Sequence, residues 1–233
     1  MAETGEWDEA LEVIEELQGS GGLLGTFGAR LLFAVPIHVH QGRLDLAREL
    51  LETSSNMKDS EELQTRSAYA WAEAVLLLAR GEDEAALAAG ARAVEALQEL
   101  GVGACKLGLV AELEAAMLLD TAKAEELVSN LERLRPGETS PFLVAQAARF
   151  RAKLSSAEHD AGFSSAVAAF RELSMPFWIA VTLLEQGEWL TAQARASEVA
   201  PLFAEAREIF DRLHARPWQD RLAQLANPES IYA

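Results

Sequence analysis

A short turn pattern that recurs at nearly constant spacing limits the fold of this chain more than any other feature of its sequence. The segment GEWDEAL at residues 5–11 returns in reduced form as GRLDLARELL at residues 42–51. Aligned on their glycines, the copies begin at Gly5, Gly42 and Gly81, which are 37 and 39 residues apart. Internal periods of this length are typical of proteins built from repeated helical hairpins.

Each of these glycines lies where a helical hairpin needs a turn. Glycine readily adopts the left-handed backbone conformation that ends one helix, and the polar or acidic residues after it favour the start of the next. Five positions further on comes a small residue, Ala10, Ala47 or Ala86, at a point where two antiparallel helices approach closely. The sequence therefore predicts an all-α fold, and little in it alternates with the period of two that strands require.

Helical periodicity and end signals predict long helices along the whole chain. The glycine-rich stretch 19–28 is expected to be a flexible joint, and Pro36 is expected to kink the helix that contains it. The expected helices cover residues 7–18, 26–41, 44–54, 60–80, 83–100, 104–119, 121–134, 141–156, 162–173, 176–194 and 198–214.

Caps mark the starts of several of these helices. Asp59 with Glu62 resembles a capping box, in which two side chains satisfy free N–H groups of the first turn. Ser140 precedes Pro141, an order typical of a cap followed by proline in the first turn. Ser197 is expected to cap the last predicted helix in the same way.

The later hairpin turns no longer carry the glycine of the first three copies. They are expected at Leu119 or Asp120, within residues 158–162, and at Ala194. Under this assignment Gly187 falls inside a helix. A glycine there is expected to allow close packing of the neighbouring helix.

Composition and charge exclude several classes of function. The chain has 233 residues, half of them hydrophobic, and 37 acidic against 20 basic residues give a formal net charge of -17. This charge disfavours direct binding to nucleic acid or to an anionic membrane surface. Cys105 is the only cysteine, which excludes an internal disulfide and a zinc site built on thiolates. With no signal peptide and no apolar run near the ~20 residues of a membrane span, a cytoplasmic location is expected.

The order of residue types at 5–11, namely glycine, acid, aromatic, Asp, Glu, Ala and Leu, resembles the turn of the tetratricopeptide repeat (TPR). The resemblance implies a right-handed α-α superhelix, a TPR-like solenoid, of about five to six helical hairpins in one domain over residues 1–233. It also implies a concave groove lined by the first helix of each hairpin. The period here is longer than the 34 residues of that family.

The C-terminal half carries a second resemblance, over roughly residues 140–222. Its segments RFRAKLSSAEHD, AAFRELSMPFWIAVTLLEQGEWLTAQ and EAREIFDRLHARPWQDRL are similar to the helical-repeat region at the C-terminus of bacterial multidomain signalling proteins. Those proteins are class III adenylate or guanylate cyclases fused to an AAA-type NTPase, and LuxR-type transcriptional activators. The similarity implies a regulatory role.

The first predicted helix lacks a preceding partner, because only four residues come before Gly5. On this reasoning the chain is predicted to be a fragment of a longer protein, whose missing part would hold any cyclase, NTPase or DNA-binding domain. The apolar stripe that is expected to be exposed, unless an earlier segment covers it, consists of Trp7, Ala10, Leu11 and Ile14.

No set of residues has the spacing of a catalytic, cofactor-binding or metal-binding site, so neither an enzyme nor a cofactor is predicted. His38 and His40 are the closest histidine pair. Two residues apart on a helix, they point about 200° away from each other and cannot hold one ion.

Six residues on predicted first helices are candidates for a partner groove. For the aromatic members, packing within the hairpins is the favoured alternative to partner binding. The candidates are Arg66, Tyr69, Trp71, Arg149, Phe177 and Trp178.

A basic cluster surrounds one of these candidates. Arg149, Arg151 and Lys153 are spaced by two, which predicts that they cannot share one helix face, and salt bridges to nearby acids are the default expectation. The alternative makes Arg149 or Arg151 an anchor for an acidic peptide or ligand.

These observations favour a non-catalytic interaction or sensory module of a bacterial signalling or transcriptional regulator, with a protein or peptide partner on its concave face. A small-molecule effector receptor, in which a closed superhelix encloses the effector, is an alternative. It would be favoured by an apolar pocket with a few convergent polar groups. A dimerisation arm is a third reading, in which the exposed helix 7–18 pairs two copies.

Overall fold

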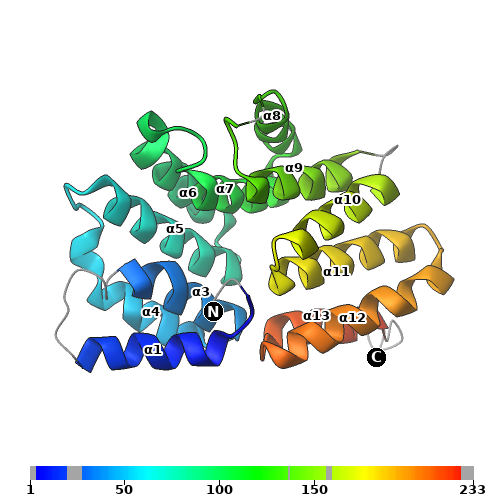
Figure 1. The fold of residues 1–233 in the computed structure, drawn as a ribbon, viewed down its shortest axis with the longest axis horizontal. Helices are drawn as coiled ribbons and strands as arrows, with labels where there is room; N and C mark the ends of the chain where they lie inside the picture. Colours follow the sequence, from blue (N-terminus) through cyan, green and yellow to red (C-terminus); the bar gives the residue numbers. More distant parts are fainter. Residues whose placement is uncertain (1–3, 20–27, 136, 156–158, 227–233) are drawn as a thin grey trace.

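The computed structural model describes residues 4–19, 28–135, 137–155 and 159–226, and every regular element within these ranges is helical (Figure 1). The all-α prediction is confirmed for this part of the chain. The α-helices are α1 (Trp7–Gly19), α3 (Val35–His40), α4 (Leu44–Thr53), α5 (Leu63–Ala79), α6 (Asp83–Leu97), α7 (Lys106–Leu119), α8 (Thr121–Glu132), α9 (Pro141–Leu154), α10 (His159–Glu172), α11 (Pro176–Ala192), α12 (Val199–Arg212) and α13 (Arg216–Ala226).

Short helical turns complete the list of elements. A π-helical turn, η1 (Arg30–Ala34), leads directly into α3, and the Val35 N–H donates to the Arg30 carbonyl oxygen, five residues back. Pro36 has no N–H to donate, and its ring crowds the preceding turn. The helix therefore widens into a π-helical turn just before Pro36, where a kink is predicted. The 3-10 turns are η2 (Ser55–Met57), η3 (Gln98–Leu100) and η4 (Ala196–Glu198).

The turns between helices follow the predicted chemistry. Gly5, Gly42 and Gly81 have φ angles of 91°, 78° and 71°, the left-handed conformation expected of them. The turn predicted at Ala194 is confirmed, with φ of 58°. The turn at Asp120 is confirmed too, because its side chain accepts hydrogen bonds from two N–H groups in the first turn of α8.

The small residues of the repeat are in contact positions. Ala47 and Ala86 are fully buried and Ala10 nearly so. Gly187 lies inside α11 directly against the ring of Phe203 on α12, and a side chain there would overlap that ring. The close helix packing predicted for this glycine is therefore confirmed.

Several predicted boundaries are wrong. Helix α5 begins at Leu63 rather than at residue 60, and neither Asp59 nor Glu62 caps it by a side-chain hydrogen bond. Ser197 lies within η4 and does not cap α12, which begins at Val199. Ser140 does cap α9, because its hydroxyl oxygen accepts from the Leu143 N–H.

Two helices differ from expectation by more than a cap. Helix α10 begins at His159, so residues 159–162 of the predicted turn are helical, and residue 158 lies outside the described residues. Helix α13 was not predicted, although Pro217 at its second position is well suited to a first turn. Of the predicted flexible joint 19–28, residues 20–27 lie outside the described residues.

The helices pack in the order in which they follow one another, and each hairpin also contacts the next. Pairs α5–α6, α6–α7, α9–α10 and α11–α12 make the most extensive contacts. The odd-numbered helices also pack on one another, in the pairs α3–α5, α5–α7, α7–α9 and α11–α13. These contacts form two runs, α3 to α9 and α11 with α13, and α9 and α11 are not in comparably close contact.

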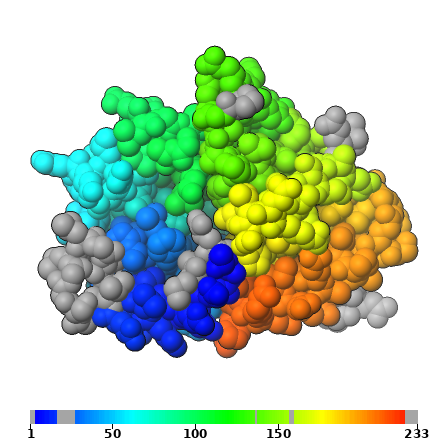
Figure 2. Space-filling view, viewed as in Figure 1, coloured from blue at the N-terminus to red at the C-terminus, as the bar shows by residue number. Residues whose placement is uncertain are grey.

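The two ends of this array meet. In Figure 1 the chain winds from α1 through α6 and α7 to α12 and α13, which return to the side of α1. Helix α13 packs on α3, and His214 Nδ1 lies 3.0 Å from Asp8 Oδ2. A Cβ atom added to Gly5 would come within 2.8 Å of the Pro176 ring. Figure 2 shows the N-terminal segment pressed against the surface of the last helices.

The apolar stripe of α1 is not exposed, so that prediction is wrong. Trp7, Ala10, Leu11 and Ile14 are only 5%, 6%, 7% and 6% exposed. They belong to the main core, together with Ala34 and Ile37, and the Trp7 ring contacts Phe177. The stripe therefore gives no argument for a preceding segment, and the apolar face proposed for dimerisation is already in use within the chain.

Among the described residues, none of the helices combines the length and the apolar character needed to cross a bilayer.

Candidate functional site

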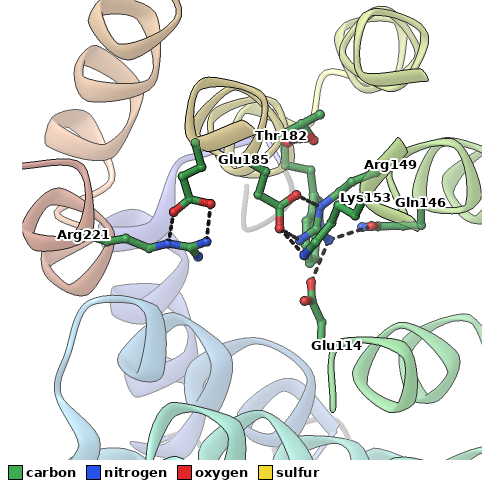
Figure 3. Close-up of polar contacts among 9 residues, drawn as sticks. Glu114, Gln146, Arg149, Lys153, Thr182, Glu185 and Arg221 are labelled. Atoms are coloured by element: carbon green, nitrogen blue, oxygen red, sulfur yellow. Dashed lines mark hydrogen bonds and ion pairs between the residues drawn. The ribbon is translucent and has the colours of Figure 1, made fainter. Parts of the chain in front are cut away.

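A cluster of opposite charges lies between helices α7, α9 and α11 (Figure 3). We call Glu114, Arg149, Lys153 and Glu185 the central charged cluster; it joins α7, α9 and α11. Arg149 is only 1% exposed, an unusual position for a charged side chain without partners. Its partners explain why it can be buried.

Arg149 forms a bidentate salt bridge with Glu185. Its Nε donates to Glu185 Oε2 and its Nη2 donates to Oε1, both at 2.6 Å. The remaining nitrogen, Nη1, donates to Glu114 Oε1 at 2.7 Å and to the side-chain oxygen of Gln146 at 3.1 Å. Paired donors of this kind match the flat geometry of a carboxylate and are among the strongest hydrogen bonds in proteins.

Lys153 approaches the same carboxylate from the next turn of α9. Its Nζ donates to Glu185 Oε1 at 2.6 Å. Lys153 follows Arg149 by four positions, so both side chains leave the same face of the helix. Helices α9 and α11 are not among the closely packed neighbours, and these long side chains bridge the space between them.

The cluster keeps its charges. Burial alone would raise the pKa of the Glu185 carboxyl, but the charges and hydrogen bonds of Arg149 and Lys153 outweigh it and hold that pKa well below its usual range. Burial would likewise lower the pKa of Arg149, yet Glu114 and Glu185 raise it. Arg149 also lies over the rings of Phe150 and Trp178, at 4.8 and 5.2 Å from their centroids.

A second ion pair connects this region to the last helix. Nε and Nη2 of Arg221 on α13 donate to the two carboxylate oxygens of Glu188 on α11, each at 2.7 Å. In Figure 3 Arg221 lies to the left of Glu185, and Glu114 lies below it. Helix α11 therefore carries two acids that bind cations from α9 and α13.

A cavity of about 330 Å³ opens beside these two acids. Its walls come from α7, α9, α10 and α11. The residues that line it are Met117, Lys153, His159, Phe163, Glu185, Glu188 and Trp189.

Aromatic rings fill the region where the ends of the array meet. Phe177 on α11 is the central member, with its ring centroid 5.3 Å from that of Trp7, 4.3 Å from His40, 5.4 Å from Trp218 and 5.2 Å from Trp178. We call these five residues the closing aromatic cluster. It ties α1, α3 and α13 to the start of α11.

The six groove candidates fall into two groups. Arg149, Phe177 and Trp178 come together, since the guanidinium of Arg149 lies over Trp178 and the two aromatic rings touch. Arg149 and Phe177 are buried, at 1% and 7% exposure, and Trp178 is partly buried. These three side chains are thus engaged in contacts within the chain.

The other three candidates lie on α5. Tyr69 is buried among the apolar residues of α3 and α4, and Trp71 packs, partly buried, beside Ala74, Ala89 and Ala111. Arg66 is partly buried and donates through Nη1 to the Ser60 carbonyl oxygen at 3.3 Å. Partner binding by Arg66 and Trp71 stays a prediction.

The basic cluster forms the salt bridges expected by default. Arg151 pairs with Glu125 and Glu132 on α8, outside the central charged cluster. The statement that the three basic residues cannot share a face is wrong for Arg149 and Lys153, which meet at Glu185. The sequence signal for this shared face is the spacing of four between Arg149 and Lys153, which places both on one side of a helix.

His38 and His40 have separate surroundings. His38 is buried, and burial together with the charge of Arg43 lowers its pKa. The His40 ring lies in the closing aromatic cluster, and burial lowers its pKa to about 4. In the part of the chain that the structure describes, no three His, Cys, Asp or Glu side chains are grouped so that they could hold a metal ion.

Comparison with known protein families, curated proteins and solved structures finds no match to this chain. Its function is therefore argued from the geometry of the cluster and the cavity. The carboxylates of Glu185 and Glu188 accept hydrogen bonds from cations at both of their oxygens. Such pairing suits the two carboxylates to binding and positioning better than to proton transfer, which needs an unpaired acid or base. His159 also lines the cavity, and its Nδ1 is buried without a hydrogen-bond partner.

Proposed function

We propose that this chain is a non-catalytic, TPR-like helical-repeat module that serves a bacterial signalling or transcriptional regulator as its small-molecule effector receptor. The packing of odd-numbered helices on one another supports the repeat architecture. In a right-handed α-α superhelix, the first helix of each hairpin lines the inner face in this way.

The meeting of the two ends is the observation that carries the effector reading. Helix α13 packs on α3, and Gln41 beside α3 binds the Leu213 carbonyl oxygen. An array whose last helix contacts its first has a short inner face. Such a face suits a small molecule better than an extended peptide, which needs a long open groove.

A link between the cavity and this closure supports a switching role. Glu188 lines the cavity and binds Arg221 of α13, the helix that packs on α3. A ligand in the cavity touches the carboxylate that holds α13. Binding is therefore expected to tighten the contact between the two ends, because a ligand stabilises the conformation that it binds best.

The chemistry of the chain supports a non-catalytic role. Cys105, the only cysteine, is buried, and burial raises the pKa of its thiol away from the reactive thiolate form. Both cavity carboxylates are paired with cations. Any cyclase or NTPase activity would belong to a domain other than this one.

A protein or peptide partner is the second candidate. Arg66 and Trp71 on α5 remain partly exposed on a first helix, where a TPR-like groove would place contact residues. Arginine and tryptophan are both enriched at the energetic centres of protein interfaces.

Hydrogen–deuterium exchange with a panel of small metabolites and a peptide array distinguishes the two candidates. The effector proposal expects a metabolite that raises the melting temperature and slows exchange at residues 40–42 and 213–218, the backbone segments at the closure. Peptide binding with protection along α5, and no response to any metabolite, would favour the second candidate and contradict the first.

A further inference from the structure

The cavity beside α11 has one charged half and one apolar half. Lys153, Glu185 and Glu188 bring charge to it, and Met117, Phe163 and Trp189 bring apolar surface. Its volume of about 330 Å³ lies within the range of small-molecule sites. The combination of apolar walls with a few polar groups is typical of sites that bind small organic molecules.

The charged groups of the cavity differ in how many hydrogen bonds they have left to make. Glu185 receives three hydrogen bonds, from Arg149 and Lys153. Glu188 receives two from Arg221, one at each oxygen. Lys153 is different, because an ammonium group has three N–H donors and its Nζ donates one charged bond, to Glu185.

Lys153 is also placed to meet a ligand. Its side chain is 23% exposed, whereas that of its partner Glu185 is 4% exposed. The ammonium group of Lys153, which also lies 5.6 Å from the centroid of the Phe150 ring, has unused donors, and its side chain lines the cavity. A ligand that accepts hydrogen bonds and carries negative charge would satisfy them.

The apolar half of the cavity is held in place from both sides. The Trp189 indole stacks on His159, with ring centroids 4.5 Å apart and planes inclined by 26°. The Arg195 guanidinium lies over the same indole at 5.4 Å, and Arg195 is itself held by Asp160 and Glu198. Phe163 is buried at 1% exposure. A wall fixed in this way loses little entropy when a ligand packs on it.

We propose that this cavity binds a small monocarboxylate with an apolar body, whose carboxylate lies on Lys153 and whose body contacts Met117, Phe163 and Trp189. The proposal rests on the effector function proposed above and names the chemical class of the effector. It assigns to Lys153 the role of anchoring residue.

The unused donors of Lys153, rather than the overall charge of the site, favour a monocarboxylate over other charged ligands. Within the two ion-pair groups, the charges of Arg149, Lys153 and Arg221 balance those of Glu114, Glu185 and Glu188. A dianion such as phosphate would place two charges beside Glu185 and Glu188. An amine would compete with Lys153 for carboxylates whose hydrogen bonds are already made. A single negative charge needs only the unused donors of Lys153.

Three probes of nearly equal shape test the class: phenylacetate, its neutral amide phenylacetamide, and the cation phenethylamine. The chain has five tryptophans, so a proton–nitrogen NMR spectrum resolves five indole signals, and the variant Trp189→Phe assigns the one in the cavity. The proposal expects phenylacetate to shift the Trp189 indole signal in a saturable manner. The amide is expected to bind at least tenfold more weakly and the amine more weakly still.

The variant Lys153→Gln tests the anchor. It removes the charge but keeps a side chain that can donate to Glu185, and it is expected to weaken phenylacetate binding about tenfold while leaving amide binding unchanged. Lys58→Gln is the matched control, because Lys58 pairs with Glu73 outside the cavity. If Lys153→Gln fails to fold, Met117→Phe narrows the cavity without replacing a member of the central charged cluster and is expected to abolish the indole shift.

The outcomes separate the failure of this inference from the failure of the proposed function. Equal binding of acid and amide, or preference for the amine, would overturn the monocarboxylate assignment but leave an effector site in the cavity. A shift of the Trp189 signal that persists in Met117→Phe would place the ligand elsewhere. No shift with any probe, while another metabolite tightens the closure, would overturn this inference alone.

Discussion

The side-chain amide of Gln41 donates a hydrogen bond to the carbonyl oxygen of Leu213, 172 positions further along the chain, at 3.2 Å. The same nitrogen lies 3.2 Å from Asp8 Oδ1. Gln41 is 2% exposed, so this contact is shielded from water. A single side chain thus joins the turn after α3 to the turn between α12 and α13.

Replacing this side chain is expected to weaken the closure. Gln41→Ala leaves the buried Leu213 carbonyl without this donor and should reduce the free energy of unfolding by about 1–3 kcal/mol. Urea unfolding measures the change. Gln98→Ala is the matched control, because Gln98 is exposed within η3 and its loss should change stability by under about 0.5 kcal/mol. Equal effects of the two substitutions would contradict a stabilising role for the closure.

Two turn glycines separate backbone strain from contact across the closure. Gly5 and Gly81 both have positive φ, but an added Cβ meets the Pro176 ring at Gly5 and nothing within 4 Å at Gly81. Gly81→Ala should therefore cost only the left-handed strain, about 1–2 kcal/mol. Gly5→Ala should cost this and roughly 1–3 kcal/mol more for the overlap. Similar losses in thermal or urea unfolding would show that the N-terminal turn does not rest on α11.

Arg149 and Arg151 provide a matched pair of ionic substitutions on one helix. Arg149→Met leaves Glu185 buried with Lys153 as its remaining cation, so a loss of about 3–5 kcal/mol in the free energy of unfolding is expected. Arg151→Met breaks the partly exposed pairs with Glu125 and Glu132 and a hydrogen bond to Ser129, and should cost under about 1 kcal/mol. If chemical denaturation gives the same value for both, the central charged cluster is not a unit of stability.

The features that depend on neighbouring residues were the ones that sequence reasoning could predict. Left-handed glycines at Gly5, Gly42 and Gly81 follow from the chemistry of a turn, and the buried positions of Ala47 and Ala86 follow from their fixed distance to it. The close packing of the next helix on Gly187 follows from the predicted turn at Ala194. Turn and cap signals lie within a few residues of the structure that they determine, so they can be recognised directly in the sequence.

The features that depend on distant segments were missed. The apolar stripe of α1 is predicted to be solvent-exposed because few residues precede Gly5. In the structure Ala34, Ile37 and Phe177, which follow α1 in the sequence, pack in the same core as this stripe. The pairing of Arg149 with Glu185 joins positions 36 apart, and no spacing rule selects one acid among the 37 in the chain. Closure of the array is decided by how each hairpin turns relative to the last, which local patterns do not encode.

The lowered pKa of His40 predicts a loss of stability in mild acid. Burial holds this pKa at about 4, whereas an exposed histidine in the unfolded chain titrates near 6.5. Below pH 6.5 the unfolded state therefore binds a proton that the folded state does not, and stability falls as the pH drops from about 6.5 towards 4. At about 1.4 kcal/mol for each pH unit, this loss reaches about 2 kcal/mol at pH 5.

The variant His40→Phe removes that proton while keeping an aromatic ring against Phe177 and Trp218. Urea unfolding at pH 7 and pH 5 should show a loss of stability that is smaller in the variant by about 2 kcal/mol. Some loss should remain, because burial and the charge of Arg43 also lower the pKa of His38. An unchanged difference between the two pH values would mean that the His40 ring is not enclosed by the closing aromatic cluster, and that the two ends of the array separate readily in solution.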